Sequence, residues 1–178
     1  MELYLEGDGL VLRSPRPSDA SAMAEAVRES QPLIGRYLVW ANADYSVTDA
    51  AQWCRVGDPA DGTRPLHVFD RKGTLLGGVG LHAPDLRNGK VELGYWTRSA
   101  ARGTGVAARA SRLVVDHAFT NLGACRVELI IAVGNVASQR VADKLGARLE
   151  GLLRDRLRLR DGLSDAHLYA LLARDFRR

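Results

Sequence analysis

A loop of small residues between a β-rich segment and a long apolar stripe constrains the fold more than any other feature of the chain. The loop reads Arg102-Gly103-Thr104-Gly105-Val106-Ala107. The stripe after it predicts one long helix that Gly123 terminates, because its apolar residues recur at helical spacing. These residues are Val106, Ala110, Leu113, Val114, Ala118 and Leu122. A strand that passes directly into a helix through such a loop is typical of an α/β domain.

The segments before the loop predict an antiparallel meander and two helices. Residues 66–70, 75–82 and 90–97 are β-rich and are separated by turn residues, as expected of neighbouring strands. A short strand at residues 10–13 precedes a helix that Ser18 or Asp19 can cap, since both side chains suit an N-cap. Residues 48–53 predict a second helix.

The segments after the long helix complete a mixed sheet. Residues 126–133 predict a strand, and Asn135 can cap a further helix that Gly146 stops. The apolar face of that strand consists of Val127, Leu129, Ile131 and Val133. Two more strands surround Asp161-Gly162, a pair typical of hairpin turns. The order strand, helix, strand, helix, strand, strand indicates an α/β architecture.

Length and composition predict one folded domain, residues 1–178. The chain has 178 residues, 46% hydrophobic and 26% charged, which are ordinary values for a globular protein. No apolar run approaches about 18 residues, and the first residues lack the basic start of a secretory signal, so we expect no membrane span and a cytoplasmic location. Cys54 and Cys125 have no metal-ligand or disulfide-framework spacing, so we expect no metal site.

The positive charge is too small to identify a partner. The formal net charge is +4. A row of four arginines alternates with apolar residues and one aspartate, as in a strand with one solvated face. These are Arg154, Arg156, Arg158 and Arg160. No aromatic residues are interleaved to stack on bases, so we expect no direct binding to nucleic acid.

The small-residue loop suits an anion such as a pyrophosphate. Small side chains let consecutive backbone N–H groups turn toward one point, at a helix N-terminus whose dipole favours negative charge. The spacing matches neither the phosphate loop of nucleoside triphosphatases nor the dinucleotide fingerprint. Taken alone, the loop is equally compatible with a tight strand-to-helix connection.

Several motifs in order resemble the GCN5-related N-acetyltransferases (GNAT). Arg102, Gly105 and Ala107 match the R/Q-x-x-G-x-G/A signature of that family. Six further stretches are similar to the branch that acetylates ribosomal-protein N-termini, and the likeness runs from residue 10 to about residue 172. They are GVGLH at 78–82, VELGYW at 91–96, RVEL at 126–129, NVAS at 135–138, KLGA at 144–147 and LEGLLR at 149–154.

The resemblance implies a mixed, mostly antiparallel, splayed sheet flanked by helices, with acetyl-CoA as co-substrate. The two central strands would part to admit the pantetheine arm. The implied binding residues are Tyr95, Trp96 and Thr97 along the arm, Arg102, Gly103, Thr104, Gly105, Val106 and Ala107 at the pyrophosphate, and Asn135 and Ser138 near the pantetheine and thiol. Because asparagine is among the best N-caps, a capping role for Asn135 stays open beside the ligand role.

The resemblance also implies direct transfer of the acetyl group to a neutral amine, without an acyl-enzyme. A backbone N–H near residues 95–97 would stabilise the oxyanion, a contribution of about 3–4 kcal/mol in other enzymes. Ser138 would donate a proton to the leaving sulfur, with an ordinary helix hydroxyl as the alternative.

The general base is where this chain departs from its relatives. Leu157 occupies the position of a glutamate in the ribosomal enzymes, and Ala142 that of a tyrosine in other branches. Glu92 is our catalytic candidate, since strand alternation puts it on the face opposite its apolar neighbours; a plain ion pair with an arginine is the alternative. His82 and Tyr169 rank below it.

The missing base bears on the acceptor. An α-amine titrates near ~7.7–8.0 and a lysine near ~10.4, so roughly a tenth of α-amines are neutral at pH 7. We therefore expect a protein or peptide N-terminus, with a ribosomal protein as the first candidate. Two alternatives remain: a small-molecule amine (amino acid, polyamine or antibiotic) and a non-catalytic acyl-CoA-binding domain. A monomer and a homodimer are both compatible with the sequence.

Overall fold

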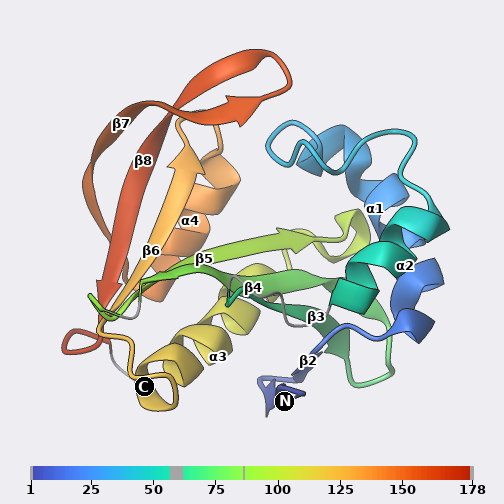
Figure 1. Ribbon diagram of the computed structural model, residues 1–178, viewed down its shortest axis with the longest axis horizontal. Coiled ribbons are helices and arrows are strands. Elements are labelled where there is room, and N and C mark those ends of the chain that lie inside the picture. The colour runs from blue at the N-terminus through green and yellow to red at the C-terminus, as the bar shows by residue number, and fades with distance from the viewer. Residues whose placement is uncertain (1, 57–61, 86, 177–178) are drawn as a thin grey trace.

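The computed structural model describes residues 2–56, 62–85 and 87–176, which form alternating strands and helices (Figure 1). In chain order they are β1 (Tyr4–Gly7), β2 (Leu10–Arg13), α1 (Ala20–Ile34), α2 (Val47–Val56), β3 (Arg64–Asp70), β4 (Leu75–Asp85), β5 (Lys90–Thr97), α3 (Val106–Thr120), β6 (Arg126–Ala132), α4 (Val136–Leu145), β7 (Arg148–Leu159) and β8 (Gly162–Leu172). Short 3-10 helices cover Pro17–Asp19 and Ser99–Ala101.

The strands form one mixed sheet in the order β1-β2-β3-β4-β5-β6-β8-β7. Every pairing is antiparallel except that of β5 with β6, which is parallel. This last pairing covers only Lys90 to Glu92 against Arg126 to Glu128. Beyond it the two strands diverge, as Figure 1 shows near the centre of the molecule. The predicted splayed and mostly antiparallel sheet is confirmed.

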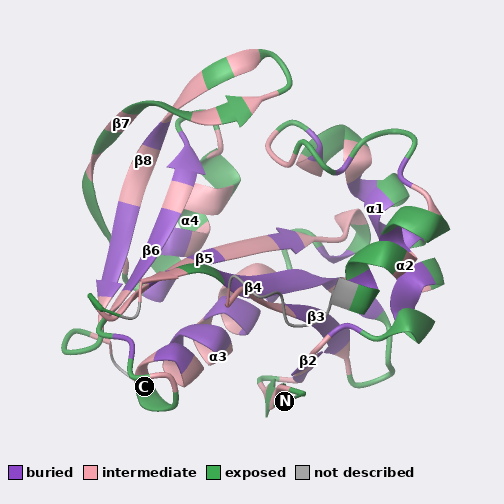
Figure 2. Ribbon diagram, viewed as in Figure 1, coloured by how far each residue is buried: buried purple, intermediate pink, exposed green. Residues whose placement is uncertain are grey.

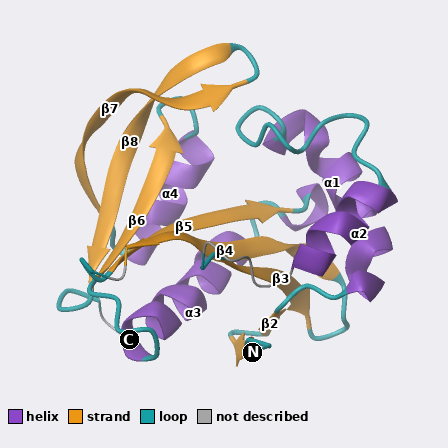
Figure 3. Cartoon of the chain, viewed as in Figure 1, coloured by secondary structure: helices purple, strands orange, loops and turns teal. Residues whose placement is uncertain are grey.

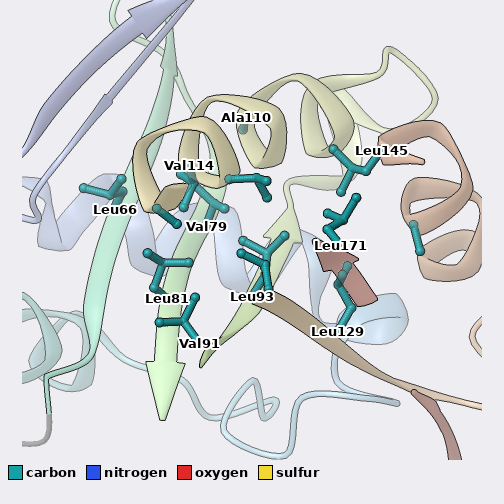
Figure 4. Packing of buried hydrophobic residues seen from close by; sticks show 14 of the residues in the cluster. Leu66, Val79, Leu81, Val91, Leu93, Ala110, Val114, Leu129, Leu145 and Leu171 are labelled. Carbon is teal, nitrogen blue, oxygen red and sulfur yellow. The ribbon is translucent and has the colours of Figure 1, made fainter. Parts of the chain in front are cut away.

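Helices cover both faces of the sheet, α3 and α4 on one and α1 and α2 on the other (Figure 3). The alternation along β5 sorts its side chains between the two layers. Val91 and Leu93 are buried in the core beneath α3, whereas Trp96 belongs to the separate core formed with α1 and α2. Figure 4 shows Val91 and Leu93 against Ala110 and Val114 of α3. Each face of β5 therefore looks toward a different helical layer.

Burial follows the predicted stripes along the strands and helices. Figure 2 shows buried residues concentrated along β6 and β8 and on the inner side of α3. On β6, Val127, Leu129 and Ile131 are buried as predicted. Val133 is not, because β6 ends at Ala132 and Val133 is exposed in the loop before α4.

The structure adds a strand that the sequence analysis missed. β1 pairs with β2 through a turn of Asp8 and Gly9, both at positive φ. An Asp-Gly pair is a strong hairpin signal, but the alternation of the four residues before it is too weak to identify a strand. At the other end of the chain, the hairpin turn consists of Arg160 and Asp161, and Gly162 begins β8. The turn therefore lies one residue earlier than predicted.

Asp19 does not cap α1 with its side chain, although it is the residue at the N-cap position. Its carboxylate instead accepts hydrogen bonds from the Arg16 amide (2.8 Å) and the Arg13 guanidinium (2.7 Å), and contacts His67 Nδ1 at 3.1 Å. Burial by itself would raise the pKa of Asp19, but hydrogen bonds from Arg13 and His67 hold that pKa far below its usual range. The side chain thus ties β2 and β3 to the start of α1.

Candidate active site

A cavity of about 430 Å³ lies where β5 and β6 diverge, between the loop before α3 and the start of α4. Ten of the eleven residues predicted to bind the co-substrate line it: Tyr95, Trp96, Thr97, Arg102, Gly103, Gly105, Val106, Ala107, Asn135 and Ser138. Thr104 is the exception, since its hydroxyl donates to the Ala101 carbonyl (2.7 Å) within the loop. The volume falls in the usual range for small-molecule sites, roughly 300–1,000 Å³.

The loop before α3 presents unused backbone donors to this cavity. Gly105 is the N-cap residue of α3, makes no side-chain cap, and has φ 79°; Gly103 has φ 76°. The first-turn N–H groups of a helix have no acceptor within the helix, and α3 has no acidic residue in its first turn. A Cβ at either glycine would meet nothing within 4 Å. The loop is thus open on the side from which an anion would approach.

Cationic side chains complete this end of the cavity. Arg102 comes from the loop, and Arg140 and Lys144 lie one turn apart on α4. Among the described residues that line the cavity, no acidic side chain accompanies them. The sequence analysis missed Arg140 and Lys144, although their i, i+4 spacing on the helix that follows Asn135 was a readable signal. The positive lining and the free amides favour a ligand with several negative charges.

Contacts with α1 fix the loop in place. The Glu29 carboxylate accepts hydrogen bonds from Arg98 and from the Ala100 amide (2.8 Å), and the buried Ser30 hydroxyl accepts from the Ser99 amide (2.8 Å). Glu25 forms a second ion pair with Arg98. Burial by itself would raise the pKa of Glu29, but the hydrogen bond from Arg98 lowers it. The loop is therefore anchored before any ligand binds.

A hydroxyl pair spans the divergence of the two strands. The Tyr95 hydroxyl of β5 lies 2.8 Å from Ser138 Oγ of α4 and also contacts the Ser138 carbonyl at 3.2 Å. Burial raises the pKa of Tyr95 to about 12, although the hydrogen bond with Ser138 acts in the opposite direction. The phenol is therefore protonated at neutral pH and can donate to Ser138 Oγ. Asn135 Oδ1 accepts from the Ser138 amide (3.2 Å), so the predicted capping role is confirmed.

Glu92 lies outside this cavity. Its carboxylate is 3.8 Å from the Arg156 guanidinium of β7, and its side chain is 26% exposed. Within β4 its partner is His82. The ion pair considered in the sequence analysis therefore exists. Leu157, one residue beyond Arg156, pairs with Ser164 of β8 and does not line the cavity.

Ala142, which stands where other branches have a tyrosine, and Tyr169, the lowest-ranked candidate base, both belong to the core. Ala142 on α4 is fully buried, and Tyr169 on β8 is buried opposite Leu129 of β6. Neither lines the cavity. Position alone therefore removes Tyr169 from the candidates and leaves Glu92 and His82, which are paired on the central strands β5 and β4.

A second cavity, of about 150 Å³, lies on the other side of Trp96. It shares Leu38, Tyr95 and Trp96 with the first cavity, and it is otherwise lined by residues of α2, β3, β4, Gly94 of β5 and the segment between α1 and α2. The sequence analysis gave no residue of this cavity a role in holding the acceptor. It missed Trp40 and Trp53, which line this cavity; two tryptophans in and beside a loop were a signal that went unused.

Two hydrogen bonds hold the segment between α1 and α2 over the cavities. The Tyr37 hydroxyl donates to the Gly134 carbonyl (2.9 Å), just before α4. Arg160, at the tip of the β7-β8 hairpin, donates to the Ala41 carbonyl (3.0 Å). Figure 1 shows this segment opposite the hairpin tip. The segment thus contacts the loop that follows β6 and the tip of the β7-β8 hairpin.

Comparison with known proteins identifies the class. Residues 9–148 match the acetyltransferase (GNAT) domain family. The chain therefore belongs to the GNAT family and is an acetyl-CoA-dependent N-acetyltransferase. No helix in the described part of the chain is long and apolar enough to cross a membrane. The same residues contain no group of three or more side chains arranged to hold a metal ion.

Individual relatives point toward the ribosomal branch. A Bacillus subtilis protein named "Putative ribosomal N-acetyltransferase YdaF" is 33% identical over 172 residues, covering 94% of this chain and 93% of that protein. A crystal structure of a probable acetyltransferase superposes with a TM-score of 0.85 at 30% identity, covering 98% of this chain and 99% of the other. Mycobacterium smegmatis RimJ in complex with CoA-disulfide has the same fold, with a TM-score of 0.88, 23% identity, and 99% and 89% coverage.

Proposed function

We propose that this enzyme transfers the acetyl group of acetyl-CoA to the α-amine of a polypeptide N-terminus, with a ribosomal protein as the first candidate acceptor. The observation that carries the proposal is a pair of neighbouring cavities, one cationic and one apolar, that share Leu38, Tyr95 and Trp96 as lining residues. A ribosomal acceptor would place the reaction in the cytoplasm.

The larger cavity has the chemistry of a CoA site. Its positive-φ glycines and free first-turn amides suit a pyrophosphate, and Arg140 and Lys144 supply charge for further phosphate. Acetyl-CoA would bring the thioester whose carbonyl is attacked. The exposed edge of β5 beyond Glu92, which has no partner on β6, offers backbone groups of Tyr95 to Thr97 to the pantetheine amides.

Ser138 is assigned the role of proton donor to the leaving thiolate. The 2.8 Å contact with Tyr95 supports this role, because either oxygen can donate in it. When the Tyr95 hydroxyl, which also donates to the Ser138 carbonyl, gives its proton to Ser138 Oγ, the serine proton is free to point into the cavity. Protonating the thiolate in this way is general acid catalysis, which contributes about 10²–10⁴-fold in other enzymes. Tyr95 is a positioning residue in this scheme.

Glu92 is assigned the role of base, acting on the amine through water. Its side chain is 26% exposed, and its carboxylate pairs with Arg156 at 3.8 Å, a distance longer than a direct hydrogen bond. A carboxylate that acts on the amine only through water is a weak base. Such a base suits an α-amine, about a tenth of which is neutral at pH 7, better than a lysine side chain.

The test measures thiol release from acetyl-CoA with two peptides of the same sequence. One peptide has a free α-amine and no lysine, and the other has an acetyl-blocked N-terminus and one lysine. We expect faster turnover of the free α-amine. Faster acetylation of the lysine peptide contradicts the proposal, and so does release only with free amino acids or polyamines.

A further inference from the structure

The smaller cavity has walls of tryptophan that are held by their neighbours. Trp53 stacks on His67 with ring centroids 5.4 Å apart, and Trp40 packs edge-on against Trp96 at 6.1 Å. His67 is itself fully buried and contacts Asp19 at 3.1 Å. Trp40 and Trp53 are nevertheless 40% and 36% exposed. Single apolar residues scattered over a surface are normal and carry no meaning. Two indoles held in place at the rim of one cavity instead indicate a binding surface.

Glycines form the floor of this cavity. Gly78 and Gly80 on β4 and Gly94 on β5 line it. A Cβ at Gly78 would lie 2.5 Å from Trp96 Nε1, and one at Gly94 would lie 2.8 Å from His82 Nε2. A side chain at either position would therefore displace a wall or the rim. The glycines thus let Trp96 and His82 lie directly against the strands that form the floor.

The size and lining of the cavity fit one apolar side chain. About 150 Å³ is the space of roughly five water molecules at ~30 Å³ each, too small for most whole ligands. No acidic side chain, lysine or arginine is among the described residues that line it; they are His82, Tyr95, tryptophans, aliphatic residues, glycines and a proline. The lining thus favours a leucine, methionine or phenylalanine side chain over a charged one.

The position of the cavity determines what its occupant is attached to. It meets the larger cavity at Tyr95 and Trp96, which line both. An amine that attacks a thioester at this junction carries its own substituent into the smaller cavity. We propose that the tryptophan-walled cavity binds the first side chain of the acceptor polypeptide and selects large apolar residues. This inference rests on the proposed function, because it names the acceptor class of the same site.

Peptides that differ only in their first residue test the inference. We expect N-terminal leucine and phenylalanine peptides to have kcat/KM values roughly ten- to hundredfold above those of alanine and serine peptides, the gain expected from burying a large apolar side chain. Trp40→Ala should cut kcat/KM at least tenfold for the leucine peptide and less than threefold for the serine peptide.

A control variant distinguishes loss of the tryptophan wall from loss of any exposed apolar side chain. Leu149→Ala removes an exposed apolar side chain (55% exposed) on β7 that does not line the cavity, and it should leave all peptides unchanged. The CoA-induced shift in melting temperature should be the same in both variants, which shows that each is folded.

Other results would overturn either this inference alone or the proposed function as well. Equal rates for all first residues, or an equal loss for every peptide in Trp40→Ala, overturn this inference and leave the proposed function standing. A preference for N-terminal lysine overturns it in favour of a cation held by the indoles. Acetylation of no peptide by CoA-binding enzyme overturns the proposed function, and this inference with it.

Discussion

The two cavities that meet at Tyr95 and Trp96 are built by different means. The larger cavity, on the α3 and α4 side, depends on backbone geometry: two positive-φ glycines, free amides and a helix start, with cations around them. The smaller one depends on side chains, above all Trp40 and Trp53 from the N-terminal third of the chain. Both open on the same strand, β5, whose alternation separates them.

This difference separates the part of the site that suits the common co-substrate from the part that would determine the choice of acceptor. Backbone amides recognise the phosphates that every acetyl-CoA molecule carries, so the larger cavity needs little beyond the loop and the helix dipole. The smaller cavity faces the acceptor, and its shape is set by which side chains reach it. Changes on one side should therefore leave binding on the other side largely intact.

The largest effect should come from breaking the support of the tryptophan wall. Asp19→Asn removes the buried partner of Arg13 and His67 and should destabilise the protein by about 3 kcal/mol at pH 7, measured by urea denaturation. Because the native pKa of Asp19 is depressed, its stabilising contribution exists above its unfolded pKa of about 3.9 and disappears as the pH falls below that value. The difference between variant and wild type should therefore shrink below about pH 4.

Asp19→Asn should impair the use of the acceptor and leave the binding of CoA intact. CoA affinity should stay within threefold in folded Asp19→Asn, whereas kcat/KM for the acceptor should fall. Glu150→Gln, which breaks an exposed ion pair with Arg126, is the control and should cost less than about 1 kcal/mol. Equal losses of stability in the two variants would show that the buried cluster of Asp19, Arg13 and His67 stabilises the protein no more than an exposed ion pair does.

Removing the proposed proton donor should have the next largest effect. Ser138→Ala should lower kcat by about 100-fold, within the usual range for general acid catalysis, while the dissociation constant of CoA changes little. Tyr95→Phe should lower kcat less, because it only positions Ser138. Stopped-flow or steady-state thiol release measures both. A Tyr95→Phe loss greater than that of Ser138→Ala would assign the proton to the phenol instead.

The two ends of α3 offer a matched test of the loop. Gly105 (φ 79°) precedes the helix, Gly123 (φ 69°) follows it, and a Cβ at either meets nothing within 4 Å. Valine at each position should cause similar backbone strain. Only Gly105→Val should weaken CoA binding, by roughly tenfold or more, as expected for the loss of a hydrogen bond to a charged group. Calorimetric titration with CoA measures it; equal weakening by Gly123→Val would refute a local role of the loop.

The smallest effect should come from the base. Glu92→Gln should lower kcat/KM for a peptide α-amine by about tenfold at pH 7, since about a tenth of the amine is already neutral there. The difference should vanish above about pH 9, where the amine needs no base. Arg156→Gln, which removes the ion-pair partner, should leave the rate within twofold. A loss in Glu92→Gln that is constant from pH 6 to 10 would mean that Glu92 has a structural role.

Sequence reasoning predicted the features that are encoded by short motifs, most of which lie on the side of the larger cavity. The loop, the long helix, the Asn135 cap and the mixed sheet all follow from neighbours within a few residues of one another. It failed where a side chain had a distant partner. Ser18 or Asp19 was expected to cap α1, but the Asp19 carboxylate binds Arg13 and His67 of two strands instead. The ion pair of Glu92 was foreseen as an alternative, but its partner, Arg156, could not be named.

The sequence by itself determined the geometry of the loop that is proposed to bind phosphate, because positive φ at glycine and the free amides of a helix start are local properties of the backbone. Only the tertiary structure decided the acceptor side. Trp40, Trp53 and Gly94 come from separate elements, and they meet because strand register and helix packing bring them to one face of β5. A pocket between elements has no local signature, since its walls are set by contacts between residues far apart in the chain.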